Sequence, residues 1–438
     1  MQQTDAVQAG LAYIEENLKA DIRISDLAAH CHYSPWHYRA LFSRAVGSSV
    51  AAYILKRRLE RALMEIAAGK TAAEVVGAYG FDTYAGFYKA FVRMYGCSPK
   101  KYLSIYRTYE PKRMEERHML TKPELQAVLS HWEAARGKTI SDYLIMNRTQ
   151  VSTDTWRVGK DMVLRTGPRE SLLRDIAASK AVAAQGLAAA VPIPTDEGAE
   201  FLDGPEIFLL TKTVPGESLT TEERTGENRH TFGLAYGRAI ARMHRALRAV
   251  EGELLPDEAD LLDSVKGWAL PEVRRQNEQW SMGLPEEFFD EYQAQIGALL
   301  PKLPRQLIHR NPHPGNILFE DGAVTGFLEY EMYERNVRLW DPCYCGTGLL
   351  SELPPSLWER WPLLFAGIVR GYDAEEGLTA EEKAAVFPVV FSIQMICIAW
   401  FEKTEGLEEL AKTNREMLRF LIEKRAETER LMRENCGF

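Results

Sequence analysis

The first hundred residues place apolar side chains at the spacing of short amphipathic helices. In ISDLAAHCHYSPWHYRALFSRAVG, residues 27–31 supply one apolar face, and Ser34-Pro35 supplies an N-cap followed by proline at the first helical position. The next helix has its buried stripe at Tyr38, Leu41, Phe42 and Ala45. Its outward positions are Trp36, Arg39, Ala40 and Ser43. The pattern predicts two helices around a tight turn.

The same layout recurs from Thr71 onward. Thr71 and Glu74 have the spacing of a capping box, and Gly80-Phe81 marks the turn. The inward positions are Ala72, Val75, Val76, Tyr79, Phe87, Ala90, Phe91 and Met94. The outward positions are Thr83, Tyr84, Ala85, Tyr88 and Lys89. Between the two units, residues 50–69 predict one connecting helix with a basic cluster at Lys56, Arg57, Arg58 and Arg61.

Beyond residue 107 the pattern changes to a connector, then strands, then helices. In residues 108–145, a highly charged segment precedes KPELQAVLSHWEAA, which has helical periodicity, so we expect a helical connector. The strand patterns TQVSTDTWRVG and DMVLRTG flank a turn at Gly159-Lys160, and a helix with Leu172, Leu173 and Ile176 follows. The strand IFLLTKTV ends at Pro215-Gly216, after which the pattern is mostly helical.

Length and charge suggest a basic N-terminal domain followed by an acidic remainder of the chain. A chain of 438 residues is long enough for two or three domains. Residues 1–107 hold 14 Lys and Arg against 9 Asp and Glu, a net charge of +5, which leaves −14 for the remainder. This asymmetry favours a nucleic-acid partner for the N-terminal part.

Cysteine spacing and hydropathy indicate the compartment. The six cysteines show no CxxC pair and no zinc-finger spacing, and the N-terminus has no basic-then-apolar signal segment, so we expect a reducing, bacterial-type cytoplasm. Residues 384–401 are uncharged and long enough to span a membrane. Pro388, Ser392 and Gln394 interrupt this stretch, which favours a buried core helix and no membrane partner.

Each helix-turn-helix pattern taken alone also fits a small helical bundle, but residues 6–105 together resemble the AraC/XylS-type regulators. The matching pieces are YIEENL, ISDLA, YSPWHYRALFSRAVG, YILKRRLERA, Gly80-Phe81 and FYKAFVRMYGCSPKKY. The resemblance implies a transcription regulator that binds double-stranded DNA in successive major grooves, with RNA polymerase as a further partner. The resemblance implies that seven residues face the bases, and Ser43 is included because it is also outward in the helical pattern. The full set is Trp36, Arg39, Ala40, Ser43, Thr83, Tyr84, Ala85 and Lys89.

Within this set Arg39 is the candidate for bidentate reading of a guanine. Gly86 costs its helix about 1 kcal/mol relative to alanine, which weakens the expectation of base reading by the second unit. The residues expected to meet phosphates or solvent are Lys56, Arg57, Arg58, Lys100 and Lys101.

The segment LIHRNPHPGNILFEDGAVTGFLEYE places a polar loop between apolar segments. With VLR, VPGESL and GRAIARMH, it resembles the aminoglycoside phosphotransferase and choline-kinase-like group of the protein-kinase fold over residues 145–400. The resemblance places the family's catalytic-base position at Asn311 and implies metal ligands at Asn316 and Glu329, with Asp341 bracing the loop. The implied nucleotide or effector site is Arg165, Asp175, Thr211 and Thr213.

The departures from that group change the expected chemistry. Phosphoryl transfer needs a carboxylate to orient the nucleophile and a metal to neutralise phosphate charge. Asn311 is an amide and cannot take up a proton near neutral pH, and Glu329 is one methylene longer than aspartate. We therefore expect no catalytic residue, while magnesium and ATP remain candidate ligands.

For several other residues we expect structural roles. His309 and His313 are expected to hydrogen-bond the loop backbone. Packing is expected for Cys343, Cys345, Trp340, Trp358 and Trp361.

The fold expected is multidomain: an all-α double helix-turn-helix domain (1–107), the connector (108–145), and an α+β kinase-like domain with an N-lobe (146–216) and a helical C-lobe (217–438). The function expected is a regulator that senses a small-molecule effector, such as a cationic amino sugar or amino alcohol, without phosphotransfer. Two alternatives stay open: an active small-molecule O-phosphotransferase with a DNA-binding domain, and a scaffold whose kinase-like domain binds another protein.

Overall fold

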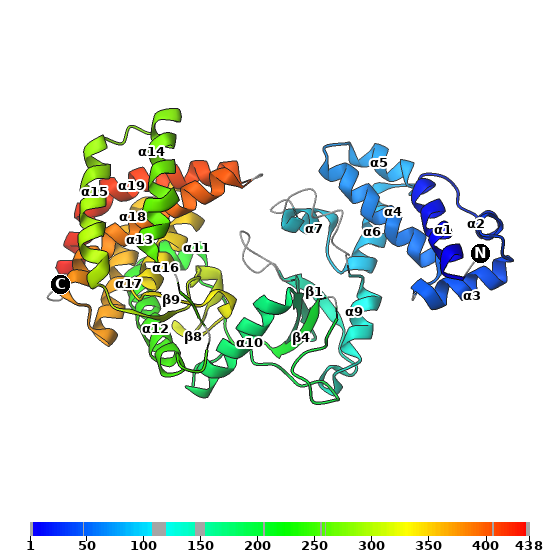
Figure 1. Cartoon of the computed structure of the whole chain (residues 1–438), viewed down its shortest axis with the longest axis horizontal. Coiled ribbons are helices and arrows are strands. Elements are labelled where there is room, and N and C mark those ends of the chain that lie inside the picture. Colours follow the sequence, from blue (N-terminus) through cyan, green and yellow to red (C-terminus); the bar gives the residue numbers. More distant parts are fainter. Residues whose placement is uncertain are drawn as a thin grey trace. The chain divides into compact units, whose positions relative to one another are not determined.

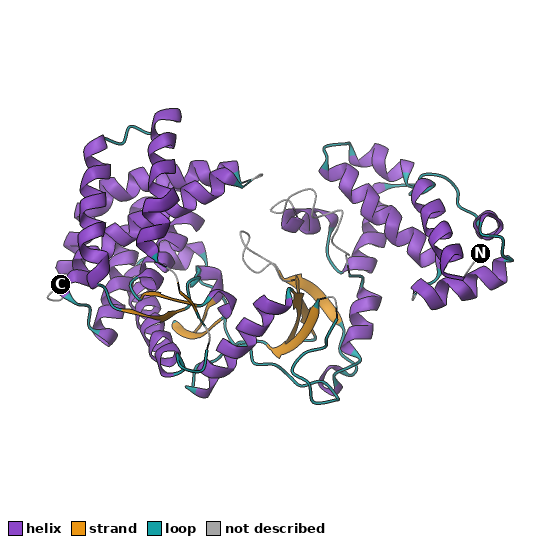
Figure 2. Cartoon of the chain, viewed as in Figure 1, coloured by secondary structure: helices purple, strands orange, loops and turns teal. Residues whose placement is uncertain are grey.

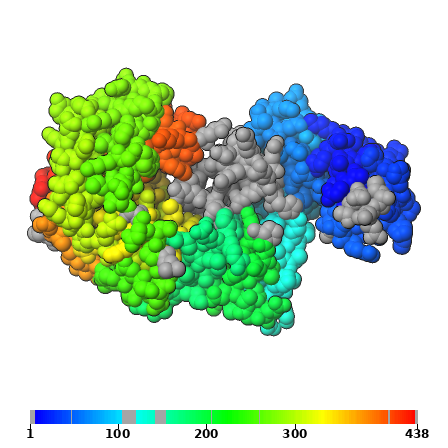
Figure 3. Space-filling view, viewed as in Figure 1, coloured from blue at the N-terminus to red at the C-terminus, as the bar shows by residue number. Residues whose placement is uncertain are grey.

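The computed structural model describes residues 3–46, 48–106, 120–144, 154–204, 206–254, 256–258, 260–404 and 407–434 (Figures 1 and 2). Backbone contacts divide the chain into two compact units. The first comprises residues 1–130 and 137–143, and the second comprises residues 131–136 and 144–438. Figure 3 shows the same face in space-filling form, with the N-terminal helices in blue.

The first unit is built of helices. They are α1 (Gln3–Glu16), α2 (Ile24–His30), α3 (Pro35–Val46), α4 (Val50–Ala67), α5 (Ala72–Ala78), α6 (Tyr84–Tyr95), α7 (Pro99–Tyr106) and α9 (Lys122–Leu129). The two predicted helix-turn-helix units are confirmed as α2–α3 and α5–α6, with α4 between them. Their turns match, because His32 and Gly80 are both left-handed, with φ of 61° and 79°.

The core of the first unit follows the predicted stripes with two corrections. Tyr38, Phe42, Phe87 and Phe91 are fully buried. Ala45 was predicted to be buried but is exposed, because its neighbour Val46 takes the partly buried position in the last turn of α3.

The second correction concerns the start of α5. The capping box at Thr71 and Glu74 does not form. The Thr71 hydroxyl donates to the Glu74 carboxylate and makes no side-chain hydrogen bond to the backbone of α5.

The connector region contains more than helix. Its described part holds α9, a short 3-10 helix η1 (Glu133–Ala135) and strand β1 (Ile140–Leu144). The helical pattern of SHWEAA breaks after α9, where Trp132 is fully buried in the second unit and its Nε1 donates to the Ile193 carbonyl at 2.8 Å. Residues 108–119, the charged part of the predicted connector, lie outside the described residues, as do residues 149–153 of the first predicted strand.

The N-terminal part of the second unit is an antiparallel sheet with one helix. Strands β2 (Asp154–Val158), β3 (Met162–Gly167) and β4 (Ile207–Lys212) pair in that order, so that Arg165 lies between Thr155 and Leu209. Helix α10 (Arg169–Ala184) follows β3. The strands and the helix predicted from 154 to 212 are confirmed.

The rest of the second unit is mainly helical (Figure 2). Its helices are α11 (Thr221–Thr225), α12 (Arg229–Ala249), α13 (Leu261–Ser264), a π-helical turn η2 (Val265–Ala269), α14 (Leu270–Gln279), α15 (Glu286–Leu299), η3 (Leu300–Lys302), η4 (Pro314–Asn316), η5 (Tyr330–Met332), α16 (Trp340–Glu352), η6 (Pro355–Arg360), α17 (Trp361–Glu376), α18 (Ala380–Lys403) and α19 (Glu408–Arg433). Two small sheets accompany them, with strand orders β5-β9-β6 and β7-β8. Their strands are β5 (Asp257–Glu258), β6 (Arg305–Ile308), β7 (Ile317–Glu320), β8 (Ala323–Phe327) and β9 (Glu334–Val337).

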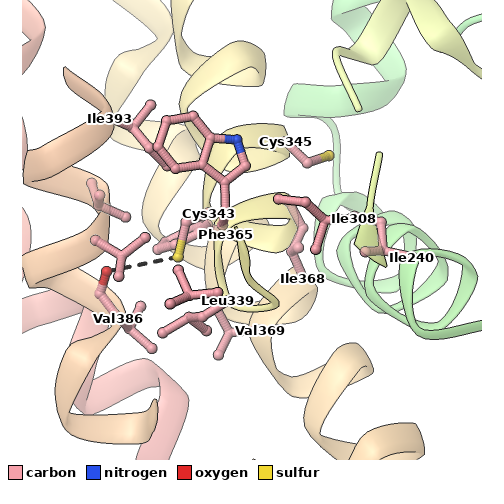
Figure 4. Close-up of a cluster of buried hydrophobic side chains, with 14 of the residues drawn as sticks. Ile240, Ile308, Leu339, Cys343, Cys345, Phe365, Ile368, Val369, Val386 and Ile393 are labelled. Atoms are coloured by element: carbon pink, nitrogen blue, oxygen red, sulfur yellow. Dashed lines mark hydrogen bonds between the residues drawn. The ribbon is translucent and has the colours of Figure 1, made fainter. Parts of the chain in front are cut away.

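The helical core explains the long apolar stretch near residue 390. Among the described residues, α18 is the helix long and apolar enough to cross a membrane, but 72% of its most apolar window is buried inside the unit. The expected core helix is confirmed. Cys343 and Cys345 are fully buried in the same core, and the Cys343 thiol donates to the Val386 carbonyl at 3.7 Å (Figure 4). Trp340, Trp358 and Trp361 also pack there, as expected.

Glycines let α12 and α17 approach closely. A Cβ built on Gly237 would lie 2.0 Å from the Ile368 carbonyl oxygen, and one on Gly233 would lie 2.3 Å from the Leu364 carbonyl oxygen. In the same way, a Cβ built on Gly367 or Gly371 of α17 would lie 2.6 or 2.3 Å from a carbonyl oxygen of α12. Because backbone atoms cannot move aside as a side chain does, this contact requires glycine on both helices.

We expect Gly237→Ala to lower the free energy of unfolding of the second unit by about 1–3 kcal/mol, because the new methyl group overpacks the helix contact. Urea unfolding followed by tryptophan fluorescence measures this, since every tryptophan except Trp36 lies in the second unit. The matched control is Gly297→Ala in α15, where the new Cβ meets only the Lys266 Nζ at 3.8 Å. It should stabilise by up to about 1 kcal/mol, and equal effects of the two changes would contradict the packing argument.

Candidate functional site

The outward face of α3 carries exposed polar and aromatic side chains. Trp36 is 78% exposed, and Arg39, Ala40 and Ser43 are exposed beside it. Among the described residues, Arg39 and Arg44 take part in no ion pair, so their charges are free for a ligand. The structure thus brings the four residues predicted for the first unit onto the exposed side of one helix.

Helix α6 presents a different exposed surface. Tyr84 and Tyr88 are 44% and 42% exposed, and their ring centroids lie 6.4 Å apart. Ala85 and Lys89 are exposed beside them. Thr83 is the N-cap residue, and its hydroxyl accepts from the Gly86 amide at 3.1 Å. Tyr88 joins the predicted set, and its outward position in the helical pattern was the signal for it.

The basic cluster of α4 makes contacts inside the first unit, and the expectation that it meets phosphates or solvent was wrong for Lys56, which is buried. Arg57 forms a two-point ion pair with Glu15 of α1 and a further one with Glu60. Lys56 is 7% exposed and donates to Glu124 of α9 at 3.0 Å. Arg58 donates to the Leu18 carbonyl at 2.9 Å. Burial acts to raise the pKa of Glu15, but Arg57 and Arg61 bring it below its usual value.

The polar loop of the second unit is held by Asp341, which is fully buried at the start of α16. Its carboxylate accepts from the backbone amides of His309 and Arg310 at 2.9 and 3.0 Å. It also lies 2.8 Å from the Nε2 of His244 in α12, whose Nδ1 lies 2.7 Å from the Tyr372 hydroxyl of α17. Sequence reasoning expected the brace at Asp341 but missed His244, the final residue of the quoted GRAIARMH.

The two loop histidines contact the backbone, as expected. The His309 Nδ1 accepts from the Asn311 amide at 3.3 Å, and its Nε2 lies 3.0 Å from the Leu328 carbonyl, which requires a neutral ring with the proton on Nε2. Burial lowers the pKa of His309 and so favours that neutral form. The His313 Nδ1 accepts from the Gly315 amide at 3.2 Å. Both side chains therefore fix the loop shape.

A buried guanidinium and three carboxylates lie next to this loop. Arg165 of β3 forms an ion pair with Asp175 of α10, and Asp175 also accepts from the Tyr330 amide at 2.8 Å. The Arg165 Nη2 lies 4.0 Å from Glu331. Burial raises the pKa of Glu331 to about 8, with Glu329 adding to the shift, and burial also raises the pKa of Glu329. Three carboxyl groups therefore share one guanidinium, and the raised pKa values favour the neutral forms of Glu329 and Glu331.

Three acceptor atoms at this site have no hydrogen-bond donor within the described chain. They are Asn311 Oδ1, Asn316 Oδ1 and Glu331 Oε2. The Asn316 Nδ2 donates to the Asn311 carbonyl at 3.1 Å, so its amide nitrogen is occupied while its oxygen is free. Arg310 and Glu329 are both left-handed, with φ of 74° and 62°, and such backbone strain in non-glycine residues is typical of functional sites.

The remaining predicted residues lie on β4 and just after it. Thr211 is buried and pairs with Val163 of β3, while the Thr213 amide donates to the Asp161 carbonyl at 2.9 Å. Within the described part of the chain, no hydrogen bond joins either threonine to Arg165, Asn316 or Glu329. Sequence reasoning missed Glu331, although its position two residues after Glu329 in LEYE was an available signal.

Known proteins resemble the two parts of the chain separately. Residues 27–105 match the helix-turn-helix domain model, and residues 147–379 match the phosphotransferase enzyme family model. The Transposon Tn10 TetD protein of Escherichia coli is 31% identical over 100 residues, which are 23% of this chain and 72% of that protein. The HTH-type transcriptional activator AarP of Providencia stuartii is 31% identical over 101 residues, 23% of this chain and 75% of that protein.

Among solved structures, the microcompartment-associated aminopropanol kinase aligns with a TM-score of 0.50 at 14% identity, covering 70% of this chain and 98% of that one. This likeness shows a shared fold. The chain belongs to the phosphotransferase enzyme family by more than half of its length, and its N-terminal part belongs to the AraC-type helix-turn-helix regulators. It is a DNA-binding regulator joined to a phosphotransferase-like domain.

We expect Arg57→Ala to destabilise the first unit by about 1–3 kcal/mol, because it leaves the nearly buried Glu60 carboxylate without its cation. Arg39→Ala should change stability by less than about 0.5 kcal/mol, since that side chain is exposed and unpaired. Hydrogen exchange of the amides in α1 and α4 measures both. If Arg39→Ala lowered the stability as much as Arg57→Ala does, the distinction between paired cations and exposed, unpaired cations would be wrong.

Proposed function

We propose that this chain is a one-component transcription regulator. Its two helix-turn-helix units bind a specific duplex DNA sequence, and its kinase-like domain binds a small-molecule effector without phosphotransfer. The effector controls DNA binding by having different affinities for the DNA-competent and DNA-incompetent states of the chain. RNA polymerase is the partner through which bound regulator acts.

The proposal of DNA binding rests on a contrast between cations that form ion pairs within the protein and cations that do not. The α4 cations are bound to Glu15, Glu60 and Glu124, whereas Arg39, Arg44, Lys89 and Arg93 have no ion-pair partner among the described residues. Free cations on the exposed faces of α3 and α6 match a polyanion that the recognition helices enter through the major groove.

The effector half rests on one observation: the buried acceptors Asn311 Oδ1, Asn316 Oδ1 and Glu331 Oε2 have no hydrogen-bond donor within the described chain, although Glu331 Oε2 lies 4.0 Å from the Arg165 Nη2. Buried acceptors without donors are costly, so they favour a ligand that brings donors or positive charge. A cationic amine, such as an amino sugar or amino alcohol, supplies both. Glu329 and Glu331 would hold its ammonium group.

The same atoms fit a divalent metal with a nucleotide. Magnesium prefers oxygen ligands, and the Asn316 amide oxygen and the Glu329 carboxylate would hold it. When bound, the ion would neutralise phosphate charge, and Arg165 would face the phosphates from β3. Nucleotide is therefore the second ligand class that this site supports.

Asn311 argues against turnover. Its backbone lies in the loop fixed by Asp341 and His309, so the loop geometry is kept while the carboxylate is replaced by an amide. An amide cannot accept the proton of an attacking hydroxyl. Slow or absent phosphotransfer is the consequence.

We expect the full chain to select a discrete sequence from a random duplex pool and to bind it with strong salt dependence. The Arg39→Ala/Lys89→Ala double variant should bind at least about tenfold more weakly, as expected for losing a base contact and a phosphate contact. Arg169→Ala/Lys180→Ala, which removes two exposed cations of the second unit, is the control and should leave affinity unchanged. Failure to enrich any sequence would refute the regulator proposal.

Calorimetry on the full chain tests the kinase-like site. We expect magnesium-dependent ATP binding that the Asn316→Ala/Glu329→Ala variant loses, and no ATP turnover with hydroxylated amines. Asn311→Asp is the matched comparison, because it restores only the carboxylate at the base position. Turnover by the unaltered chain would support the alternative function, an active small-molecule O-phosphotransferase with a DNA-binding domain, and would refute sensing without phosphotransfer.

If neither nucleotide nor any amine binds, the scaffold alternative gains support, since the free acceptors would then serve a protein partner. Thermal-shift screening of amines with and without ATP and magnesium distinguishes these outcomes, because a ligand that binds only the folded state raises its unfolding temperature.

A further inference from the structure

We propose that the two recognition helices read chemically different half-sites: α3 reads guanine through Arg39, and α6 reads the C5-methyl groups of thymines through Tyr84, Ala85 and Tyr88. This inference rests on the proposed DNA-binding function and specifies which bases each helix recognises. The chain would then bind an asymmetric operator in one orientation only.

Helix α3 has the chemistry for guanine. Guanine presents two acceptors, O6 and N7, in the major groove, and the guanidinium fork matches them. Arg39 lies in the second turn of α3, is exposed, and has no protein acceptor within the described part of the chain. Its fork is therefore not committed elsewhere, in contrast to the guanidinium of Arg57 in α4.

Helix α6 has no guanine-reading side chain at the positions where recognition helices contact bases. The N-terminal residues of a recognition helix contact the base edges, and on α6 these are Tyr84, Ala85 and Gly86. None of them carries a guanidinium or a side-chain amide. The Thr83 hydroxyl already accepts from the Gly86 amide, which commits that oxygen to the helix cap. Lys89, the sixth residue of α6, carries an ammonium group without the guanidinium fork, and Arg93 lies one turn further along the helix; we assign both to phosphates.

Helix α6 offers a pair of exposed aromatic rings, whereas the exposed aromatic residue of α3, Trp36, is accompanied by the Arg39 fork. Tyr84 and Tyr88 are two of the few large hydrophobic side chains exposed on the described chain, and their rings are neighbours. In the major groove thymine is the base with a methyl group, and apolar side chains recognise it by contact. The ring pair with the Ala85 methyl group therefore favours thymine at the base pairs that α6 faces.

Gly86 supports close approach of α6 to DNA. A Cβ at this position would meet only the Thr83 hydroxyl oxygen at 3.5 Å, so packing within the protein does not require glycine. Glycine in a helix nevertheless costs about 1 kcal/mol relative to alanine. A missing side chain next to Tyr84 and Ala85 lets the helix backbone lie nearer to the groove floor, where the methyl groups are.

The test uses the duplex selected by the full chain and alters single functional groups of its bases. Replacing thymine by deoxyuridine removes only the methyl group, and replacing guanine by 7-deazaguanine removes only the N7 acceptor. In the half-site bound by α6, each deoxyuridine should weaken binding about fourfold, the value of one buried methyl group. In the half-site bound by α3, 7-deazaguanine at one guanine should weaken binding by about fivefold or more.

Variants assign each effect to a helix. Tyr84→Ala should remove the sensitivity to deoxyuridine and keep the sensitivity to 7-deazaguanine, and Arg39→Ala should do the reverse. Gly86→Ala should raise stability yet weaken DNA binding. Gly77→Ala in α5, another exposed helical glycine whose Cβ would contact nothing, should raise stability alone.

The outcomes separate this inference from the proposed function. If no sequence is selected, the DNA-binding function itself fails. If a sequence is selected but deoxyuridine has no effect in either half-site, or if Tyr84→Ala leaves that effect unchanged, α6 does not read methyl groups and the inference is wrong while the regulator remains.

Discussion

The second unit depends on one buried carboxylate, that of Asp341. A carboxylate removed from water is stable only when donors surround it, and this one has the amides of His309 and Arg310 and the imidazole of His244. These donors come from the polar loop and from α12, and Tyr372 extends the contact to α17. The position of the loop is thus tied to the packing of the helical core, which the glycines of α12 and α17 bring together.

Residues other than Asn311 fix the loop backbone. The side chain at position 311 therefore changes the chemistry of the loop and not its shape. His309 and Asp341 hold the backbone of this loop, in which Arg310 is strained and Asn311 carries an amide side chain. The nearby cluster of Arg165, Asp175, Glu329 and Glu331 holds more carboxylate than guanidinium. This composition is the basis for proposing that the site holds a cation or a donor-rich ligand.

The first unit divides its cations between structure and recognition. Arg57, Arg58 and Lys56 join α1, α4 and α9, so that both helix-turn-helix units are held by one rigid helix. Ion pairs at this degree of burial position helices more than they add net stability. Among the described residues, the cations of α3 and α6 take part in no ion pair. Because α9 is bound to α4 through Glu124, the segment after the DNA-binding helices is part of the first unit.

Periodicity and motif determined much of this protein in advance. The inward stripes at Phe42, Phe87 and Phe91 and the two turns follow from local spacing, which depends only on neighbouring residues. The loop motif also places Asn311 where the resembled group has its catalytic carboxylate, and this assignment stays a prediction.

Only the tertiary structure shows which residues that are distant in the sequence contact one another. A basic run in α4 has the same sequence pattern whether it meets phosphates or Glu15 and Glu124, and only the packing of α1 and α9 against it shows the latter. His244 and Glu331 gained their roles from residues far along the chain, because hydrogen bonds and burial are properties of the folded arrangement, which local spacing does not encode.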